Sequence, residues 1–340
     1  MNISIIGTGS WGTANAVLLA NSRHDVTVWG RTAAHVEEIA RTRTNTRYLP
    51  GVELPASIQW TTSAARAMKD ADIVVIAVPS RHFETVCRDF RPYLPKSATV
   101  VSLTKGFTPS SHRRMTEVAA ETLGTSRVVA LSGPSHAEEV VRGMPTAVTA
   151  ASADLSCARL VQAIWSGPGF RVYTSDDIVG VEAGGAVKNV LALAVGASDG
   201  LGLGDNTRAA LITRGLAEIT RFSCALGGRP ETLAGLSGAG DLIVTCTSRH
   251  SRNHQVGERL ARGETLMSIV GSMQMVAEGV GNAQIVHEMA GELGVEMPIA
   301  DCVWRVCYEG YPVRCAISDL MNRPVKDEAW SGAEAWRERS

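Results

Sequence analysis

A glycine-rich turn near the N-terminus constrains the fold of this chain more than any other feature. The run NISII at residues 2–6 leads directly into Gly7-Thr8-Gly9-Ser10-Trp11-Gly12, and a second run, DVTVW, occupies residues 25–29. In a strand–turn–helix unit, the first glycine permits the tight turn, the second lets the backbone approach a pyrophosphate, and the third allows close helix packing. The helix N-terminus adds unpaired N–H groups and a partial positive charge. Gly7, Gly9 and Gly12 therefore predict a dinucleotide site.

The residue after the second strand bears on which dinucleotide binds. NAD sites commonly carry a carboxylate there for the ribose 2′-hydroxyl, whereas an arginine accommodates a 2′-phosphate. This chain has Gly30-Arg31 at that point and no Asp or Glu. The alternative is a solvated surface arginine. Arg31 favours NADPH, or use of both cofactors.

Length and composition exclude several classes of protein. With 340 residues and a formal charge of −1, the chain is long enough for two domains, and its charge favours neither nucleic acid nor membrane partners. Its 7 cysteines include no C-x-x-C pair, so we expect reduced thiols in a cytoplasmic protein and no metal site. We find no signal-peptide pattern, and the best apolar stretch, 187–196, is too short to span a bilayer.

The pattern of apolar runs predicts two halves of different character. Up to residue 178, β-branched runs alternate with helical stretches such as 11–21 and 33–41, which indicates a doubly wound parallel sheet of the Rossmann type. From 179 to 326 the pattern is mostly helical, and 327–340 is a polar tail. The predicted strands are 3–6, 26–29, 73–78, 99–103, 128–131 and 147–150. The later predicted helices are 178–198, 208–226, 251–262, 282–293 and 299–308.

Ligand-binding groups in such sheets gather in loops beyond the carboxyl ends of the strands. Four loops of suggestive composition follow predicted strands. They are 7–12, 78–80, Thr104-Lys105-Gly106 and Ser132-Gly133-Pro134-Ser135. Their clustering predicts one composite site.

Lys188 is the first candidate for chemistry in the helical half. It lies among Ala183, Gly184, Gly185, Ala186 and Val187, on a small apolar stretch of predicted helix. Desolvation there would lower its pKa toward the working range of an acid–base catalyst. The alternative is a lysine that extends to solvent at the helix edge.

Two further segments offer charged or polar groups. Asp241 follows Gly238-Ala239-Gly240, where it can orient the Lys188 ammonium or bind a substrate hydroxyl, or simply cap a helix. Ser251-Arg252-Asn253 supplies a hydroxyl, a guanidinium and an amide at a predicted helix start. That set suits a phosphate, although an ordinary capped surface helix with a surface His250 explains it equally. Lys105, Gly133 and Ser135 are candidates for the same anion. Together these groups predict hydride transfer to a small anionic carbonyl compound.

As a set, the motifs resemble those of the bacterial NAD(P)-dependent sn-glycerol-3-phosphate dehydrogenases. The resemblance runs from residue 1 to about 325 and keeps one order of motifs. They are GTGSWGTA at 7–14, TKG at 104–106, SGPS at 132–135, GGAVKNV at 184–190, GDL at 240–242 and SRN at 251–253.

The resemblance implies reversible, NADPH- or NADH-dependent reduction of dihydroxyacetone phosphate to sn-glycerol 3-phosphate, which supplies glycerophospholipid synthesis. It makes Lys188 the proton donor and acceptor, supported by Thr245. The residues implied to line the substrate are Lys105, Gly133, Ser135, Lys188, Asp241, Ser251, Arg252 and Asn253. Those implied to contact the cofactor, with Gly7, Gly9 and Gly12, are Ser10, Trp11, Arg31, Lys105, Ala137, Arg252, Val276 and Glu278.

The chain departs from the family pattern in two places. His136 replaces a phenylalanine common in relatives, and the segment after Glu278 lacks the usual aromatic–arginine pair. Two alternatives stay open: a related dehydrogenase that acts on a 3-hydroxy acid or sugar acid, and a non-catalytic NAD(P) sensor. We expect a phosphorylated triose as partner, no nucleic acid and no stable membrane insertion, and we keep a homodimer open.

Overall fold

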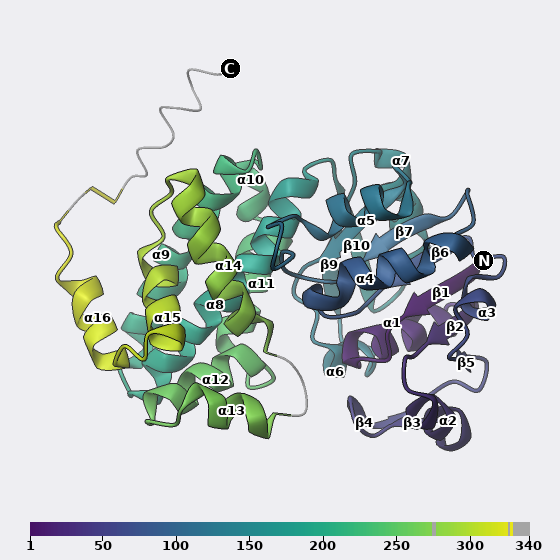
Figure 1. Cartoon of the computed structure of the whole chain (residues 1–340), viewed down its shortest axis with the longest axis horizontal. Helices are drawn as coiled ribbons and strands as arrows, with labels where there is room; N and C mark the ends of the chain where they lie inside the picture. The colour runs from purple at the N-terminus through teal and green to yellow at the C-terminus, as the bar shows by residue number, and fades with distance from the viewer. Residues whose placement is uncertain (274–276, 326, 329–340) are drawn as a thin grey trace.

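The computed structural model describes residues 1–273, 277–325 and 327–328. It consists of a sheet covered by helices and, beside it, a bundle of helices packed around the long helix α8 (Ile178–Gly200) (Figure 1). This arrangement confirms the predicted fold class, a Rossmann-type sheet followed by a mostly helical half.

The main sheet has eight strands in the order β10-β9-β8-β7-β6-β1-β2-β5. The apolar strand β1 lies inside it, with Ile6 paired to Trp29 on one side and to Ile76 on the other. Burial on both faces explains the β-branched runs that predicted these strands. The strands are β1 (Asn2–Ile6), β2 (Asp25–Trp29), β5 (Gln59–Thr61), β6 (Ile73–Ile76), β7 (Thr99–Ser102), β8 (Val128–Ser132), β9 (Thr146–Ala151) and β10 (Phe170–Ser175).

The sheet differs from the expected all-parallel arrangement at one place. Strand β9 runs antiparallel to β8, and β10 then runs parallel to β9. The short connection between β8 and β9 holds only the one-turn helix α6 (Ala137–Val140), too little for the crossover that a parallel pair requires. The sequence analysis also missed β5, β10 and the hairpin of β3 (Thr44–Asn45) and β4 (Leu49–Glu53), which are short or mostly polar.

Helices cover both faces of the sheet. Their apolar residues pack into two buried clusters, one on each face, built largely from the alternating side chains of the same strands. These helices are α1 (Ser10–Asn21), α2 (Ala33–Thr42), α3 (Ala64–Met68), α4 (Ser80–Phe90), the 3₁₀ turn Arg91–Tyr93, α5 (Met115–Leu123), α6 and α7 (Leu155–Trp165).

Helix α8 is the central element of the molecule. The Asp177 carboxylate caps it by accepting the Gly180 N–H at 2.8 Å. The expectation that no apolar stretch approaches membrane-spanning length is wrong. Helix α8 is long and apolar enough to cross a membrane, because its most apolar 18-residue segment has a mean hydropathy of 1.6. However, 83% of that segment is buried inside the protein. Its hydropathy therefore reflects a core position.

The helical half packs around α8. Gly257 lies directly against the Leu193 carbonyl, so α8 and α12 approach backbone to backbone. The elements are α9 (Gly204–Ala225), α10 (Pro230–Leu233), the π-helical turn Leu236–Gly240, α11 (Asp241–Thr247), α12 (Arg252–Ala261), α13 (Leu266–Ser272), α14 (Glu278–Leu293), α15 (Pro298–Tyr308) and α16 (Val313–Met321). The predicted polar tail lies almost entirely outside the described residues.

Candidate active site

The glycine loop after β1 has the geometry that a dinucleotide requires. Gly7 has a φ of +121°, and a Cβ there would collide with the Ala77 carbonyl oxygen. A Cβ on Gly12 would collide with the Gly7 carbonyl oxygen, whereas one on Gly9 would meet nothing within 4 Å. The turn is thus closed on its inner side and open at Gly9, where helix α1 begins. This open helix N-terminus fits a pyrophosphate.

The other predicted cofactor residues surround this loop in different ways. Ser10 opens α1, and half-buried Trp11 packs against the small apolar cluster that contains Ala137. Arg31 is exposed just beyond β2 and forms no ion pair with the described residues. Glu278 is half-buried at the start of α14 and accepts a hydrogen bond from Ser80 Oγ at 3.1 Å. Val276 lies outside the described residues.

Glu278 brings the helical half to the edge of the sheet. Ser80 begins α4 just beyond β6, and the Thr104 hydroxyl donates to the Val78 carbonyl at 2.7 Å, which joins the loops after β6 and β7. Burial raises the pKa of Glu278, opposed by the Ser80 hydrogen bond and the charge of Arg252. Glu278 therefore places a carboxyl group with a raised pKa beside the loops that follow β6 and β7.

Lys188, Asp241 and Lys105 form the polar centre of the molecule. The Lys188 ammonium donates to Asp241 Oδ1 and, at 2.7 Å, to Thr245 Oγ1. The second carboxylate oxygen, Oδ2, accepts from Lys105 Nζ at 2.6 Å. Lys188 is 5% exposed and Asp241 1%, so the alternative of a lysine extending to solvent does not describe this structure. One buried carboxylate orients two ammonium groups.

Burial lowers the pKa of Lys188 to about 7. The Asp241 charge acts in the opposite direction, and the positive charge of Lys105 adds to the lowering. A lysine in this state can both give and take a proton near neutrality.

The alternative role of Asp241, a helix cap, is also not what the structure shows. Asp241 is the first residue of α11, and the capping position belongs to Gly240, which has no side chain. The preceding π-helical turn packs closely on α8, because a Cβ on Gly184 would collide with the Ser237 carbonyl oxygen. Asp241 therefore faces Lys188 and Lys105 because of this backbone packing, and not because it caps a helix.

Ser251, Arg252 and Asn253 lie at the start of α12, as expected. Ser251 Oγ caps the helix by accepting the His254 N–H at 3.3 Å. The Asn253 amide donates to Asn189 Oδ1 at 2.9 Å and accepts the Gly279 N–H at 2.9 Å, so it ties α8 to α14. Half-buried Arg252 has its pKa lowered by burial, with Glu278 and Glu138 opposing. Capping and anion binding are compatible here.

The loop after β8 completes the arrangement. Gly133 has a φ of +143°, and its carbonyl accepts both Lys105 Nζ at 3.2 Å and Ser135 Oγ at 2.9 Å. A Cβ on Gly133 would stand 2.9 Å from Val148 Cα, so the loop needs glycine. The loops after β7 and β8 thus meet Asp241 of the helical half through Lys105, and the Thr104–Val78 hydrogen bond connects the loop after β6 to them.

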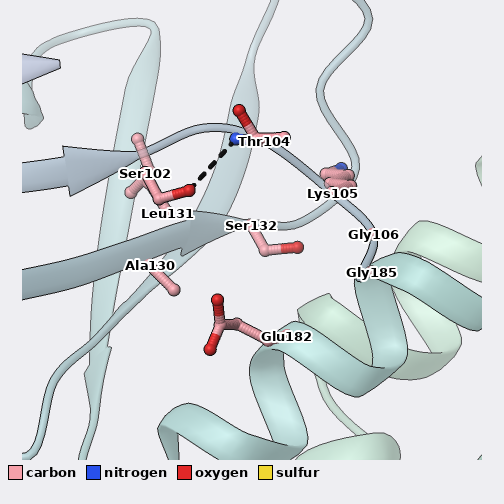
Figure 2. A pocket seen from close by; sticks show the side chains of 9 residues that line it. All are labelled: Ser102, Thr104, Lys105, Gly106, Ala130, Leu131, Ser132, Glu182 and Gly185. Atoms are coloured by element: carbon pink, nitrogen blue, oxygen red, sulfur yellow. Dashed lines mark hydrogen bonds between the residues drawn. The ribbon is translucent and has the colours of Figure 1, made fainter. Parts of the chain in front are cut away.

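A small cavity lies beneath Lys105, between the ends of β7 and β8 and the start of α8 (Figure 2). The volume open to the centre of a water molecule is about 10 Å³, so the cavity has room for roughly one water. The buried Ser132 hydroxyl, which borders it, has no hydrogen-bond partner among the described residues, and Glu182 borders it from α8. This cavity suits a single bridging water.

His136 and His250 occupy places that the sequence did not predict. Their rings lie 5.9 Å apart, and His250, expected at the surface, is half-buried. Burial lowers the pKa of His136, and the charges of Lys188 and Lys105 lower it further. Its buried Nε2 has no partner among the described residues. His136 therefore presents a neutral ring beside the two lysines.

Two structural contributors were missed by the sequence analysis. Asn189, next to Lys188, holds Asn253 in place. Glu182 accepts the Thr116 N–H at 2.9 Å and Arg114 Nη1 at 2.8 Å, which fixes α8 against the sheet half. The only sequence signal for Asn189 and Glu182 was that both lie on the same predicted helix as Lys188.

Within the described residues, no group of three or more His, Cys, Asp or Glu side chains is placed to hold a metal. All 7 cysteines are free.

Comparisons with known proteins agree on one family. Its two sequence models, the N-terminus and C-terminus of NAD-dependent glycerol-3-phosphate dehydrogenase, match residues 2–158 and 177–318. The chain is 49% identical to glycerol-3-phosphate dehydrogenase [NAD(P)+] of Geobacillus kaustophilus, over 96% of each chain. It is 48% identical to the Moorella thermoacetica protein of the same name, over 97% of this chain and 98% of the other.

Solved structures show the same likeness. A crystal structure of glycerol-3-phosphate dehydrogenase from Coxiella burnetii superposes with a TM-score of 0.92 at 38% identity, covering 95% of this chain and 99% of that one. A ketopantoate reductase from Ralstonia eutropha reaches a TM-score of 0.61 at 19% identity, which shows a shared fold alone.

Proposed function

The chain belongs to the NAD-dependent glycerol-3-phosphate dehydrogenase family, and from that premise we propose how its residues carry out the reaction. It is an NAD(P)-dependent oxidoreductase that interconverts dihydroxyacetone phosphate and sn-glycerol 3-phosphate. The observation that supports the catalytic assignment is the buried Lys188 ammonium, held by Asp241 and Thr245 at the meeting point of both halves.

We assign cofactor binding to residues 1–178 and substrate binding and proton transfer to residues 179–326. Gly9 leaves open space above the loop for the pyrophosphate, and exposed Arg31 lies just beyond the end of β2. When bound, the nicotinamide supplies or accepts the hydride at the substrate carbon. Ser10, Trp11, Lys105, Ala137, Arg252, Val276 and Glu278 are the other cofactor contacts that we propose.

In reduction, the Lys188 ammonium donates a proton to the substrate oxygen as negative charge develops on it. The same charge stabilises that oxygen before the proton moves, inside a site with little water to screen it. Asp241 fixes the ammonium in place, and Thr245 Oγ1 accepts a hydrogen bond from one of its N–H groups. In oxidation, neutral Lys188 takes the hydroxyl proton.

The phosphate end of the substrate is assigned to Arg252 and Asn253 at the start of α12, with Ser251, Lys105, Gly133 and Ser135 lining the remainder. The guanidinium offers a fork of donors to phosphate oxygens, and the helix N-terminus adds its partial charge. Anchoring the phosphate sets the approach of the carbonyl carbon. Lys105 shares Asp241 with Lys188, so it also links the two ends of the site.

Neither alternative raised by the sequence is favoured. A 3-hydroxy acid or sugar acid offers no phosphate for Arg252, and the Ralstonia eutropha ketopantoate reductase shares only the fold. A sensor has no need of a buried proton donor. We propose a cytoplasmic enzyme that supplies glycerophospholipid synthesis, with a homodimer as its candidate assembly.

The test is an initial-rate assay with dihydroxyacetone phosphate and each reduced cofactor. We expect saturable oxidation of NADPH or NADH, and a far smaller rate with unphosphorylated dihydroxyacetone. A preference for a phosphate-free 2-keto or 3-keto acid would establish the other dehydrogenase class. Cofactor binding without turnover on any triose phosphate would establish the sensor.

A further inference from the structure

Two arginines stand on opposite sides of the glycine loop. Strand β1 lies between β2 and β6, with Ile6 paired to Trp29 and to Ile76. Arg31 comes two residues after Trp29, and Arg81 is the second residue of α4, just beyond β6. Both are exposed. The parallel strands therefore bring two guanidinium groups to the same edge, one on each side of the cofactor loop.

His82 lies close enough to both arginines for their charges to affect its pKa. Arg81 Nε donates to His82 Nε2 at 3.1 Å, so this nitrogen accepts and carries no proton. Burial lowers the pKa of His82, and the positive charges of Arg81 and then Arg31 lower it further. Two guanidinium groups from separate loops thus act on one imidazole.

Both arginines keep their charge available for a ligand. In the part of the chain that the structure describes, no ion pair joins Arg31 or Arg81 to a carboxylate. Glu278 feels the charge of Arg81, but its carboxylate accepts the Ser80 hydroxyl. Arg81 uses Nε for His82, which leaves both terminal nitrogens available for another acceptor.

We propose that Arg81 is a second specificity determinant, which holds the 2′-phosphate of NADPH together with Arg31. This inference rests on the proposed role of Arg31 and extends it to a residue with no role so far. A ribose phosphate carries about two negative charges and three acceptor oxygens at neutral pH, enough for two guanidinium forks. His82 orients Arg81 by accepting a hydrogen bond from Arg81 Nε. NADH has only a hydroxyl at that position and gains nothing from either arginine.

The experiment compares Arg81→Ala and Arg31→Ala with Arg88→Ala as the matched control. Arg88 lies on the same helix, is exposed and pairs with Glu84, so its loss removes one positive charge from α4 away from the loop. Steady-state KM values for NADPH and NADH are measured with dihydroxyacetone phosphate. Binding of adenosine 2′,5′-bisphosphate and of 5′-AMP is measured by calorimetry, which requires no turnover.

We expect Arg81→Ala to raise the KM for NADPH and the Kd for the bisphosphate by about 10- to 100-fold, because a hydrogen-bonded ion pair is lost. The KM for NADH and the Kd for 5′-AMP should stay close to wild type, as should every value for Arg88→Ala. Equal losses for both cofactors, no loss, or a matching loss in Arg88→Ala would overturn the proposal. Calorimetry separates this outcome from failure of the proposed reaction.

Discussion

The two halves of the molecule build their parts of the site in opposite ways. In the sheet half, the cofactor site is a backbone turn in which Gly7 and Gly12 leave no room for a Cβ. In the helical half, the reacting group is the Lys188 side chain in the middle of α8, and burial together with the charges of Asp241 and Lys105 sets its pKa. A turn is determined by a few neighbouring residues, whereas a buried lysine depends on segments far apart in sequence. The two parts should therefore fail differently when altered.

The largest effect is expected from removing the ammonium itself. Lys188→Ala should lower kcat by about 10²- to 10⁴-fold, the usual contribution of a positioned acid–base group. NADPH binding, followed by cofactor fluorescence, should change little because the glycine loop is in the other half. Exposed Lys69→Ala serves as the control. A near-normal kcat in the Lys188 variant would remove this residue from the mechanism.

The next effect concerns the carboxylate between the lysines. Reduction needs protonated Lys188, whose pKa is about 7, so kcat for reduction should fall as pH rises through that value, and kcat for oxidation should rise. Asp241 holds this pKa up, so Asp241→Asn should move both pH profiles to lower pH by about one unit or more. At pH 7 the reduction rate should drop by roughly one to two orders of magnitude. Unshifted profiles would show that Asp241 does not set the lysine charge.

How far the sequence predicted each half follows from the same difference. Apolar runs and the glycine spacing located β1, α1 and β2 to within about a residue, because these signals are local. The antiparallel direction of β9 and the two short strands of the β3–β4 hairpin depend on tertiary pairing and were missed. The sequence left two roles open for Lys188, because its burial exists only after α11 packs on α8. The contact between the His250 and His136 rings likewise depends on tertiary packing.

A matched pair of glycine substitutions tests the comparison directly. Gly12→Ala places a Cβ against the Gly7 carbonyl oxygen, and Gly257→Ala places one against the Leu193 carbonyl oxygen. Each should lower the free energy of unfolding by about 1 to 3 kcal/mol through overpacking. We expect Gly12→Ala to raise the KM for NADPH and Gly257→Ala, which displaces α12 and Arg252, to raise the KM for dihydroxyacetone phosphate.

Gly9→Ala is the control for this pair, because a Cβ there meets nothing within 4 Å in the free protein. It should leave the free energy of unfolding near wild type and weaken cofactor binding, since the added methyl group occupies the approach of the pyrophosphate. If each of Gly12→Ala and Gly257→Ala raised the KM for NADPH and the KM for dihydroxyacetone phosphate together, the two halves would not act separately.

The helix N-termini differ between the halves in the same way. The N-terminus of α1 carries no acidic residue in its first turn and stays open beside Gly9. The N-terminus of α15 is closed by Glu218 of α9, whose carboxylate accepts the Ile299 N–H at 2.8 Å and the Ala300 N–H at 3.2 Å. One terminus is available for a ligand anion, and the other is satisfied by a buried side chain.

Glu218 should therefore make stability depend on pH, an effect smaller than those expected at the site. Burial raises its pKa to about 7, against the two N–H donors that favour the charged form. The folded protein then keeps a proton that the unfolded chain releases above its ordinary pKa. The free energy of unfolding should therefore fall as pH rises from about 4.5 to 7, by about 3 kcal/mol. In Glu218→Gln this slope should disappear in urea titrations at several pH values, whereas exposed Glu231→Gln should retain it. If the pH dependence of the free energy of unfolding were unchanged in Glu218→Gln, the Glu218 carboxylate would be charged over this whole pH range. The N–H groups at the start of α15 would then stabilise its charge, as the N-terminus of α1 would stabilise a bound anion.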